Sequence, residues 1–513
     1  MLSRSRIFSC ELLETRRVLS ATSIVADQLV NDPTIGNQVG SEGDSAAYLE
    51  SGELVAVYSG RGLGDSDGIY FRRIDSDGEV VGSPQLVNQT VAGEQTNASV
   101  AQLPSGGFLV VWEGRGAGDR AGIFARWYDA AGTAITGEVL INQTTGGSQQ
   151  NAQVAVAEDG TATFVWDGVG SGDFDGVFLR QFTSSGQAVA GELLVNTATI
   201  YQQAYADVAI NDSGQIMVTW SSRHQDGSDW GIYGQAFTAA GVKSGTEFLV
   251  NTETELSQSN ASLVAVGDDF VVAWQSRSQG GNDWDLFGQR IDSSGAAIGG
   301  EFQINAASAG NQHEVKLAAT SSGSVVVAWT DGIEDGTGWN VKAREIDLSE
   351  TTPVLADEFF VNESTANGAF GHQRASSIAA TDEAFAIAFS GDGAVDHDGM
   401  YLACYVGDFE PNLSPDMEPI PDQTAQVGVE LVIQITATDP NGGDTLTYIL
   451  DAEDSPAGAT IEKIDNNHAV IRWTPTADDL PGPVSFRVLV IDDGEPPLAD
   501  DEAFVVTLTA ASS

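Results

Sequence analysis

The chain is poor in basic residues: 22 lysines and arginines stand against 73 aspartates and glutamates, which gives a formal net charge of −51. A surface with so little positive charge repels nucleic acids and anionic lipid headgroups, so we expect neither as a partner. It attracts cations, calcium above all, because hard cations prefer oxygen ligands. The composition differs from that of a disordered acidic chain, because 42% of the residues are hydrophobic.

Three other features are scarce or missing. The chain has only two cysteines, Cys10 and Cys404, so a disulfide framework is not expected to stabilise the fold. No apolar run approaches the roughly 18 residues needed to cross a bilayer, so no membrane-spanning segment is predicted. No segment shows sustained helical periodicity, and the chain is therefore predicted to be all-β.

What the chain has instead is a tandem repeat. An apolar pair followed by asparagine recurs at Asn31, Asn88, Asn142, Asn196, Asn251, Asn305 and Asn362. A second series of aromatic residues, each closing an apolar run, keeps step with it at Tyr58, Trp112, Trp166, Trp220, Trp274, Trp329 and Phe389. We expect these aromatics to be core residues between the repeated units. Each unit contains four short alternating segments separated by glycine and aspartate turns. Four antiparallel strands in a unit of this length predict the blade of a β-propeller.

The phase of the copies predicts how the array closes. The first asparagine-bearing strand, residues 27–31, precedes any second or third strand, and the unit around Phe389 has no fourth strand after it. The N-terminal strand is therefore expected to complete the last blade, which would remove exposed strand edges. We predict a seven-bladed β-propeller over residues 23–408.

The repeats also carry a resemblance. The segments 229–237 (DWGIYGQAF) and 285–291 (DLFGQRI) resemble the third strand of propeller repeats in large bacterial calcium-binding surface proteins. The resemblance covers the predicted propeller and is one of repeat pattern, so it implies a fold and no specific function.

A second domain is expected after an acidic, proline-rich linker at residues 409–418. Residues 419–513 contain alternating strands, expected at residues 431–437, 446–450, 469–473, 485–491 and 503–508. Their segments 437–448, 456–460, 472–475 and 490–494 resemble, in order, those of a bacterial dystroglycan-type cadherin-like domain. The resemblance implies an immunoglobulin-like β-sandwich that binds calcium weakly. The ligand positions it implies are Asp439, Asn441, Asp444, Asp492 and Asp493.

The N-terminal segment 1–22 has a basic start without the apolar core of a standard signal peptide. Its residues 12–21 (LLETRRVLSA) resemble the short LEPR-type leader of exported planctomycete proteins, with Thr15 where that family usually has proline. The resemblance implies an extracellular or cell-surface location. A disordered tail is the alternative.

Acidic loops between the second and third strands form another candidate metal site. Three of them read Asp-x-Asp-Gly, a pattern that supplies carboxylates to calcium but lacks the remaining ligands of an EF-hand. The candidate ligands are Asp65, Asp67, Asp173, Asp175, Asp396 and Asp398. The alternative is a hairpin turn in which aspartate and glycine satisfy the local backbone.

Three tryptophans outside the aromatic series are candidate ligand-binding residues. Trp230, Trp284 and Trp339 each lie beside aspartate or glycine in a loop between the second and third strands. Several such rings on one face are expected to stack on sugars, and packing over the loops is the alternative.

The sequence shows no catalytic motif, and its charged residues mostly recur with the repeat. We therefore interpret it as a non-catalytic binding or adhesion protein that presents a protein or glycan ligand site at the cell surface. The alternative is a propeller-based glycan hydrolase or lyase, which requires non-repeating acids and bases that converge at one mouth of the central channel.

Overall fold

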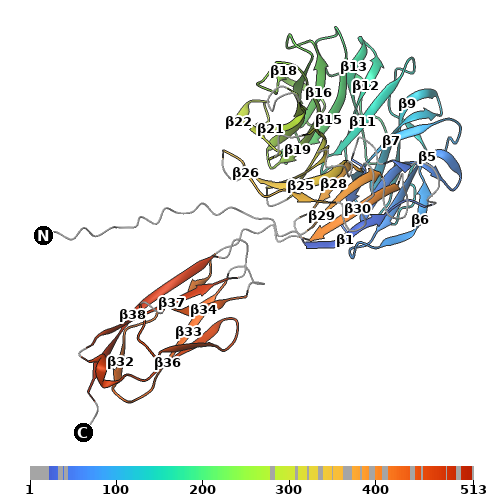
Figure 1. The fold of residues 1–513 in the computed structure, drawn as a ribbon. Coiled ribbons are helices and arrows are strands. Elements are labelled where there is room, and N and C mark those ends of the chain that lie inside the picture. The colour runs from blue at the N-terminus through green and yellow to red at the C-terminus, as the bar shows by residue number, and fades with distance from the viewer. Residues whose placement is uncertain are drawn as a thin grey trace. The chain divides into compact units, whose positions relative to one another are not determined.

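The computed structural model describes residues 22–32, 38–39, 44–277, 283–306, 310–320, 323–332, 339–348, 351–361, 373–381, 384–391, 399–406, 414–439, 445–451, 454–480, 482–492 and 498–510. They form two compact units, residues 22–406 and residues 414–510 (Figure 1). The predicted leader, residues 1–22, lies outside the described residues except for Thr22.

The described part of the first unit contains seven sheets. The first three sheets comprise, in turn, β2 (Gln38–Val39), β3 (Ala46–Tyr48), β4 (Leu54–Gly62), β5 (Asp65–Ile74) and β6 (Val80–Leu86); β7 (Gln95–Gln102), β8 (Phe108–Gly116), β9 (Asp119–Tyr128) and β10 (Val139–Leu140); and β11 (Gln149–Val156), β12 (Ala162–Gly170), β13 (Asp173–Phe182) and β14 (Leu193–Leu194). The next two comprise β15 (Gln203–Ile210), β16 (Ile216–Arg223), β17 (Trp230–Phe237) and β18 (Lys243–Leu249); and β19 (Gln258–Val266), β20 (Asp269–Ser276), β21 (Asp285–Ile291) and β22 (Ala297–Gln303).

The sixth sheet comprises β23 (Gln312–Ala319), β24 (Val325–Asp331), β25 (Asn340–Asp347), β26 (Val354–Leu355) and β27 (Phe359–Phe360). The seventh comprises β28 (Gln373–Ala380), β29 (Ala384–Gly391), β30 (Gly399–Val406) and the N-terminal strand β1 (Thr22–Leu29). The prediction of an all-β fold made mainly of four-stranded sheets, as in β-propellers, is confirmed.

The inner strands of the sheets form a closed ring. Strands β3, β7, β11, β15, β19, β23 and β28 contact one another in that order, and β28 contacts β3. Figure 1 shows the sheets of this unit arranged around a common centre. Because every inner strand runs in the same sense, corresponding residues of different sheets meet at the same end of the ring.

The N-terminal strand completes the last sheet, as the phase of the repeat predicts. Strand β1 pairs antiparallel with β30, and the Val30 N–H donates to the Met400 carbonyl over 2.8 Å. The Met400 N–H in turn donates to Asn31 Oδ1, also over 2.8 Å. Two segments about 370 residues apart in sequence thus make the contacts that neighbouring strands make elsewhere.

The aromatic series lies in the core, as predicted. Each of its seven members is at most 2% exposed. Trp112 stacks on Phe124 and Trp166 on Phe178, with both pairs of ring centroids 6.2 Å apart. Burial of such large side chains between sheets is a main source of stability in this unit.

The repeated asparagine is a buried hydrogen-bonding hub. Asn142 is 2% exposed, and its Oδ1 accepts from the Ile123 N–H over 2.8 Å. Its Nδ2 donates to Asp119 Oδ2 at 2.8 Å, to the Thr144 carbonyl at 2.9 Å and to Gln149 Oε1 at 3.2 Å. Asn88 and Asn196 make the same set of contacts in their own repeats. The side chain therefore ties the fourth strand to the third strand and to the next inner strand.

We expect the substitution Asn142→Ala to lower the free energy of unfolding by about 3 kcal/mol. It leaves the buried Ile123 N–H and Gln149 Oε1 without this partner, and each such group is destabilising by about 1–3 kcal/mol. Chemical denaturation measures the effect. The exposed neighbour Thr145 provides the control, because Thr145→Ala is expected to change little. Equal stabilities of the two variants would contradict the role assigned to Asn142.

Many acidic residues join neighbouring sheets. Glu138 accepts hydrogen bonds from the backbone N–H groups of Gln89 and Thr90, at 3.0 and 3.1 Å. Glu192 makes the same contacts one repeat later, with Gln143 and Thr144 at 2.7 and 3.2 Å. Part of the high negative charge is therefore structural and recurs with the repeat.

The second unit contains two four-stranded sheets. One has the order β31 (Asp416–Met417), β33 (Leu431–Thr438), β36 (His468–Trp473), β35 (Thr460–Lys463). The other has the order β32 (Gln423–Gln426), β38 (Ala499–Thr509), β37 (Val484–Ile491), β34 (Thr447–Leu450), and a short 3-10 helix, η1 (Ala477–Asp479), precedes β37. Strand β31 lies within the predicted linker 409–418, so that segment is in part a strand of this unit.

A continuous apolar core fills the second unit, with Ile435, Trp473 and Phe486 each at most 2% exposed. Across the described residues of both units, no helix is long and apolar enough to span a membrane.

Candidate functional site

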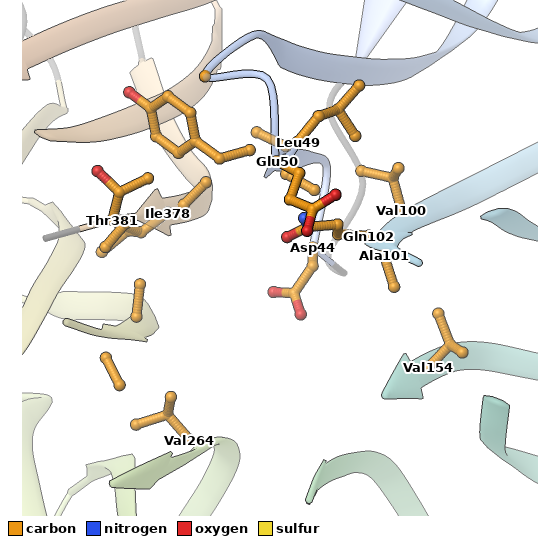
Figure 2. A pocket seen from close by; sticks show the side chains of 18 residues that line it. Asp44, Leu49, Glu50, Val100, Ala101, Gln102, Val154, Val264, Ile378 and Thr381 are labelled. Atoms are coloured by element: carbon orange, nitrogen blue, oxygen red, sulfur yellow. The ribbon is translucent and has the colours of Figure 1, made fainter. Parts of the chain in front are cut away.

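A cavity of about 690 Å³ lies inside the ring of inner strands (Figure 2). Apolar residues and polar residues such as Gln102 both line it, and Figure 2 shows Val154 and Val264 on different sides of it. The carboxylates of Asp44 and Glu50 lie on the wall formed by the first sheet. We call this space the Glu50 cavity; it opens where the inner strands end.

One position on the inner strands breaks the repeat. In each sheet, this inner-strand residue pairs with the second-strand residue that comes directly before the aromatic of the series. Four sheets carry serine at this position: Ser45, Ser99, Ser262 and Ser377. The other three carry Gln153, Asp207 and Lys316. Two of the seven equivalent positions are therefore charged, and these charges do not recur with the blade.

These charged groups act on one another within the ring. Burial, together with the negative charge of Asp44, raises the pKa of Asp207 to about 7. The Leu263 N–H, at 2.8 Å from Oδ2, and Lys316 oppose this increase. Burial also raises the pKa of Asp44, while Lys316 lowers it. Neutral carboxyl groups near pH 7 are typical of sites that transfer protons.

Two further carboxylates lie at the opposite end of the ring, where the inner strands begin. Glu113 and Asp167 each directly follow an aromatic of the series, on β8 and β12. Asn151 connects them: its backbone N–H donates to Glu113 Oε2 over 2.6 Å, and its Nδ2 donates to Asp167 Oδ1 over 2.9 Å. We call this end the Glu113 mouth.

Asp167 is 2% exposed and lines a second pocket, of about 220 Å³, together with Gln150 and Gln202. Burial raises the pKa of Asp167 to about 7 despite hydrogen bonds from Asn151, Tyr205 and Gln150, and the negative charge of Glu113 contributes to the increase. Asp167 is therefore a carboxyl group that holds its proton close to neutral pH, beside a second carboxylate.

The three predicted tryptophans lie at this same end of the ring, beside the starts of their third strands. Trp284 and Trp339 flank His313, with ring centroids 5.9 and 6.5 Å from the imidazole. The Arg374 guanidinium lies 4.6 Å from the Trp339 ring centroid. The structure thus brings two of the three together, whereas Trp230 lies on β17 with the Arg223 guanidinium 5.9 Å from its ring centroid.

The acidic Asp-x-Asp-Gly segments open the third strands. Asp65 accepts from Asn88 Nδ2 over 2.8 Å, and Asp173 accepts from Asn196 Nδ2 over 2.8 Å. The other oxygen of each accepts from the N–H two residues later, at Asp67 and Asp175, which are exposed. These first aspartates already have protein partners. Asp396 and Asp398 lie outside the described residues.

Two of the predicted calcium ligands of the second unit are described. Asp439 follows β33 and Asp492 follows β37, and Asn441, Asp444 and Asp493 lie outside the described residues. Strand β31 joins the two strand ends, since it pairs with the end of β33 while the Met417 N–H donates to Asp500 Oδ2 of β38 over 2.8 Å. The two aspartates thus belong to the same end of the unit. Among the described residues of the chain, no group of three or more histidine, cysteine or acidic side chains is arranged to hold a metal ion.

The sequence analysis did not single out the charged residues of the ring. Alignment of the repeats on the aromatic series gives the signal that finds them. The position after the aromatic is Ser59, Ser221, Gln275, Thr330 or Ser390 in five repeats, and it is Glu113 or Asp167 in the other two.

Comparisons with known proteins give fold-level neighbours only. No protein-family model and no curated protein matches the chain. Similar solved structures include a protein of unknown function from Dyadobacter fermentans, with 11% identity over 75% of this chain and 99% of that one and a TM-score of 0.45. They also include an α-L-arabinanase from Penicillium chrysogenum (10% identity, 75% and 98% coverage, TM-score 0.41) and an α-L-arabinofuranosidase from Fusarium graminearum (10%, 76% and 99%, 0.40).

The interpretation as a non-catalytic binding or adhesion protein is corrected. Several of the similar structures are glycoside hydrolases. The original interpretation assumed that charged residues recur with the blade. Within the ring they do not: Glu113 and Asp167 at one mouth, and Asp207 and Lys316 further along, interrupt the repeat.

Proposed function

We propose that the first unit is a closed seven-bladed β-propeller that hydrolyses glycosidic bonds at the Glu113 mouth. Seven sheets, a closed ring of inner strands and the pairing of β1 with β30 support the number of blades and the closure. The single observation that carries the activity is the pair of non-repeating carboxyl groups, Glu113 and Asp167, on adjacent blades and joined by Asn151.

The two carboxyl groups suit glycoside hydrolysis because that reaction needs one protonated and one ionised carboxyl group at the bond that breaks. Asp167, with a pKa of about 7, is the candidate general acid that protonates the leaving oxygen. Glu113 supplies the second carboxylate, which activates water or attacks the sugar carbon. Asn151 holds both groups in position through its two hydrogen bonds.

The expected substrate is a neutral polysaccharide. A net charge of −51 disfavours polyanionic glycans, since like charges repel. Trp284 and Trp339, which are half-buried beside His313 at the same end of the ring, are the candidate side chains for stacking on sugar rings. Arabinose-containing polymers belong among the first candidates, because neighbours of this fold act on them.

We expect the purified protein to release reducing ends from at least one polymer in a panel of neutral plant and microbial polysaccharides. The panel includes arabinan, xylan, mannan and β-glucan, with polygalacturonate as the anionic comparison. A second preparation carrying Glu113→Gln controls for contaminating hydrolases, and it is expected to be inactive. Activity that is equal in both preparations, or absent from both, would contradict the proposal.

For the second unit we propose an immunoglobulin-like β-sandwich, on the basis of its two packed four-stranded sheets. A weak calcium site at the end that carries Asp439 and Asp492 belongs to the same proposal. Export to the cell surface, implied by the leader resemblance, would bring the hydrolase to polymers that do not enter cells.

A further inference from the structure

The loops that enter the inner strands share a backbone conformation. The fifth residue after the repeated asparagine has a positive φ in every described case. It is glycine in three loops, Gly93 (95°), Gly147 (87°) and Gly310 (86°). In the loops that lead into the fourth and fifth sheets it is Tyr201 (69°) and Leu256 (60°). Two bulky residues thus occupy a position that carries glycine in the other three described loops.

This conformation is unfavourable for residues with a side chain, by about 1–2 kcal/mol relative to a right-handed one. Core packing does not offset that strain here, because Tyr201 is 60% exposed and Leu256 is 50% exposed. Strained residues of this kind cluster at ligand-binding and catalytic sites.

Tyr201 lies next to the proposed catalytic pocket, and Leu256 contacts the loop that leads into β17. Tyr201 precedes Gln202, which lines the Asp167 pocket, and its ring contacts His224 edge-on with centroids 5.0 Å apart. The Leu256 carbonyl accepts hydrogen bonds from the Ser228 hydroxyl at 3.2 Å and from the Asp229 N–H at 3.3 Å.

Backbone hydrogen bonds connect the segment that contains Tyr201 to β16 and to Asp167. The Arg223 N–H donates to the Gln202 carbonyl over 2.9 Å. Four residues after Tyr201, the Tyr205 N–H donates to Asp167 Oδ1 over 3.0 Å. Tyr201 therefore lies beside the Glu113 mouth. Leu256 follows further out, because its carbonyl binds the Asp229 N–H and the Asp229 carbonyl accepts from the His224 N–H over 2.6 Å.

We infer that Tyr201 and Leu256 form a binding subsite for the chain of a neutral polysaccharide that extends from the bond cleaved at Asp167. The inference rests on the proposed function and names where the substrate lies. An exposed aromatic ring and an aliphatic side chain match the apolar faces of uncharged sugars. Their position fixes the polymer over the loops of the fourth and fifth blades.

The test uses the full-length protein and the polymer found in the substrate panel. We expect Tyr201→Gly to raise KM about tenfold with kcat nearly unchanged, and Tyr201→Phe to retain the original KM. The melting temperature of Tyr201→Gly should not fall, because glycine relieves the unfavourable φ. Leu256→Gly is expected to change KM in the same direction, by a smaller factor.

A matched control is available in the same sheet. Val242 is 61% exposed and lies in the turn between β17 and β18, at the opposite end of the ring from Trp230. We expect Val242→Gly to leave KM unchanged. Binding provides a readout that is independent of turnover: in an Asp167→Asn background, Tyr201→Gly should weaken calorimetric affinity for the intact polymer about tenfold.

The outcomes separate this inference from the proposed function. Hydrolysis by the unmodified protein, with KM and affinity unchanged in Tyr201→Gly, overturns the subsite and leaves the activity intact. A lower melting temperature in that variant without a change of KM assigns Tyr201 a structural role instead. Hydrolysis of no polymer by the unmodified protein overturns the proposed function, and the subsite with it.

Discussion

Replacing Asp167 by asparagine is expected to lower the rate of polysaccharide hydrolysis by about 10²–10⁴-fold, the usual contribution of a general acid. The substitution removes the proton that Asp167 holds near neutral pH. It keeps two of the three hydrogen bonds to this side chain and loses the one that Oδ2 accepts from Gln150 Nε2 at 3.2 Å. The retained Oδ1 still accepts from Asn151 Nδ2 and from the Tyr205 N–H, at the positions now 2.9 and 3.0 Å away. The loss should therefore appear in kcat more than in KM.

The pH dependence gives a second signature of Asp167. Because its pKa is raised to about 7, chiefly by burial, the acid form is present below pH 7 and is lost above it. We expect the rate of hydrolysis by the unmodified protein to decline as the pH rises through 7. The stability effect has the same origin: the unfolded chain releases this proton from about pH 4 upwards, so the contribution of Asp167 to folding stability falls between pH 4 and pH 7. Asp167→Asn removes that fall and should be no less stable than the unmodified protein at pH 8.

Kinetics across pH 5–9, with chemical denaturation at both ends of the range, tests these expectations. Asp212→Asn removes an exposed carboxylate from the hairpin between β15 and β16 and serves as the control. A kcat for Asp167→Asn within twofold of the control would exclude Asp167 as the acid, and the pair with Glu113 would lose its assigned role.

Deletion of the N-terminal strand is expected to have the largest effect on stability. A chain that starts at residue 33 lacks β1 and the buried Val30, and it exposes the edge of β30. Burial of one valine contributes about 1.5–3 kcal/mol, and the lost strand pairing and the contacts of Asn31 add to this. The sum approaches the 5–15 kcal/mol that stabilises a typical domain. We expect incomplete folding or aggregation through the exposed edge.

A chain that starts at residue 22 is the control for this deletion, since it keeps β1. Thermal unfolding should separate the two proteins by more than about 10 °C if the shorter one folds at all. A peptide of residues 22–32 added in trans should recover part of the loss by strand addition. Identical unfolding curves for the two proteins would show that pairing of β1 with β30 does not close the ring.

The sequence predicted the strands well because each carries its own periodic signal. The aromatic series marked the core, and all seven residues are buried. In the second unit the expected strands 431–437, 446–450, 469–473, 485–491 and 503–508 coincide with β33, β34, β36, β37 and β38 to within a few residues. Alternating hydrophobicity is a local property, so it can be read without knowledge of distant contacts.

The roles of polar residues were harder to predict because they depend on partners far away in the sequence. Asp65 and Asp173 matched a calcium-loop pattern, yet each accepts a hydrogen bond from an asparagine 23 residues later. In the sequence, the same asparagines are recognisable only as the last residue of the repeated tripeptide. Their function as hubs became visible once the fourth strand lay beside the third.

By itself, the sequence determined the repeat, the all-β class and the phase that pairs the N-terminal strand with the last sheet, because periodicity and order along the chain suffice for these. Only the tertiary structure decided where chemistry can occur. The ring of inner strands brings Glu113 and Asp167 to Asn151, and it brings Asp44, Asp207 and Lys316 within electrostatic reach of one another. Burial then raises the pKa of Asp167 and Asp207 towards neutrality. Proximity and desolvation are properties of the closed ring, which no single repeat contains.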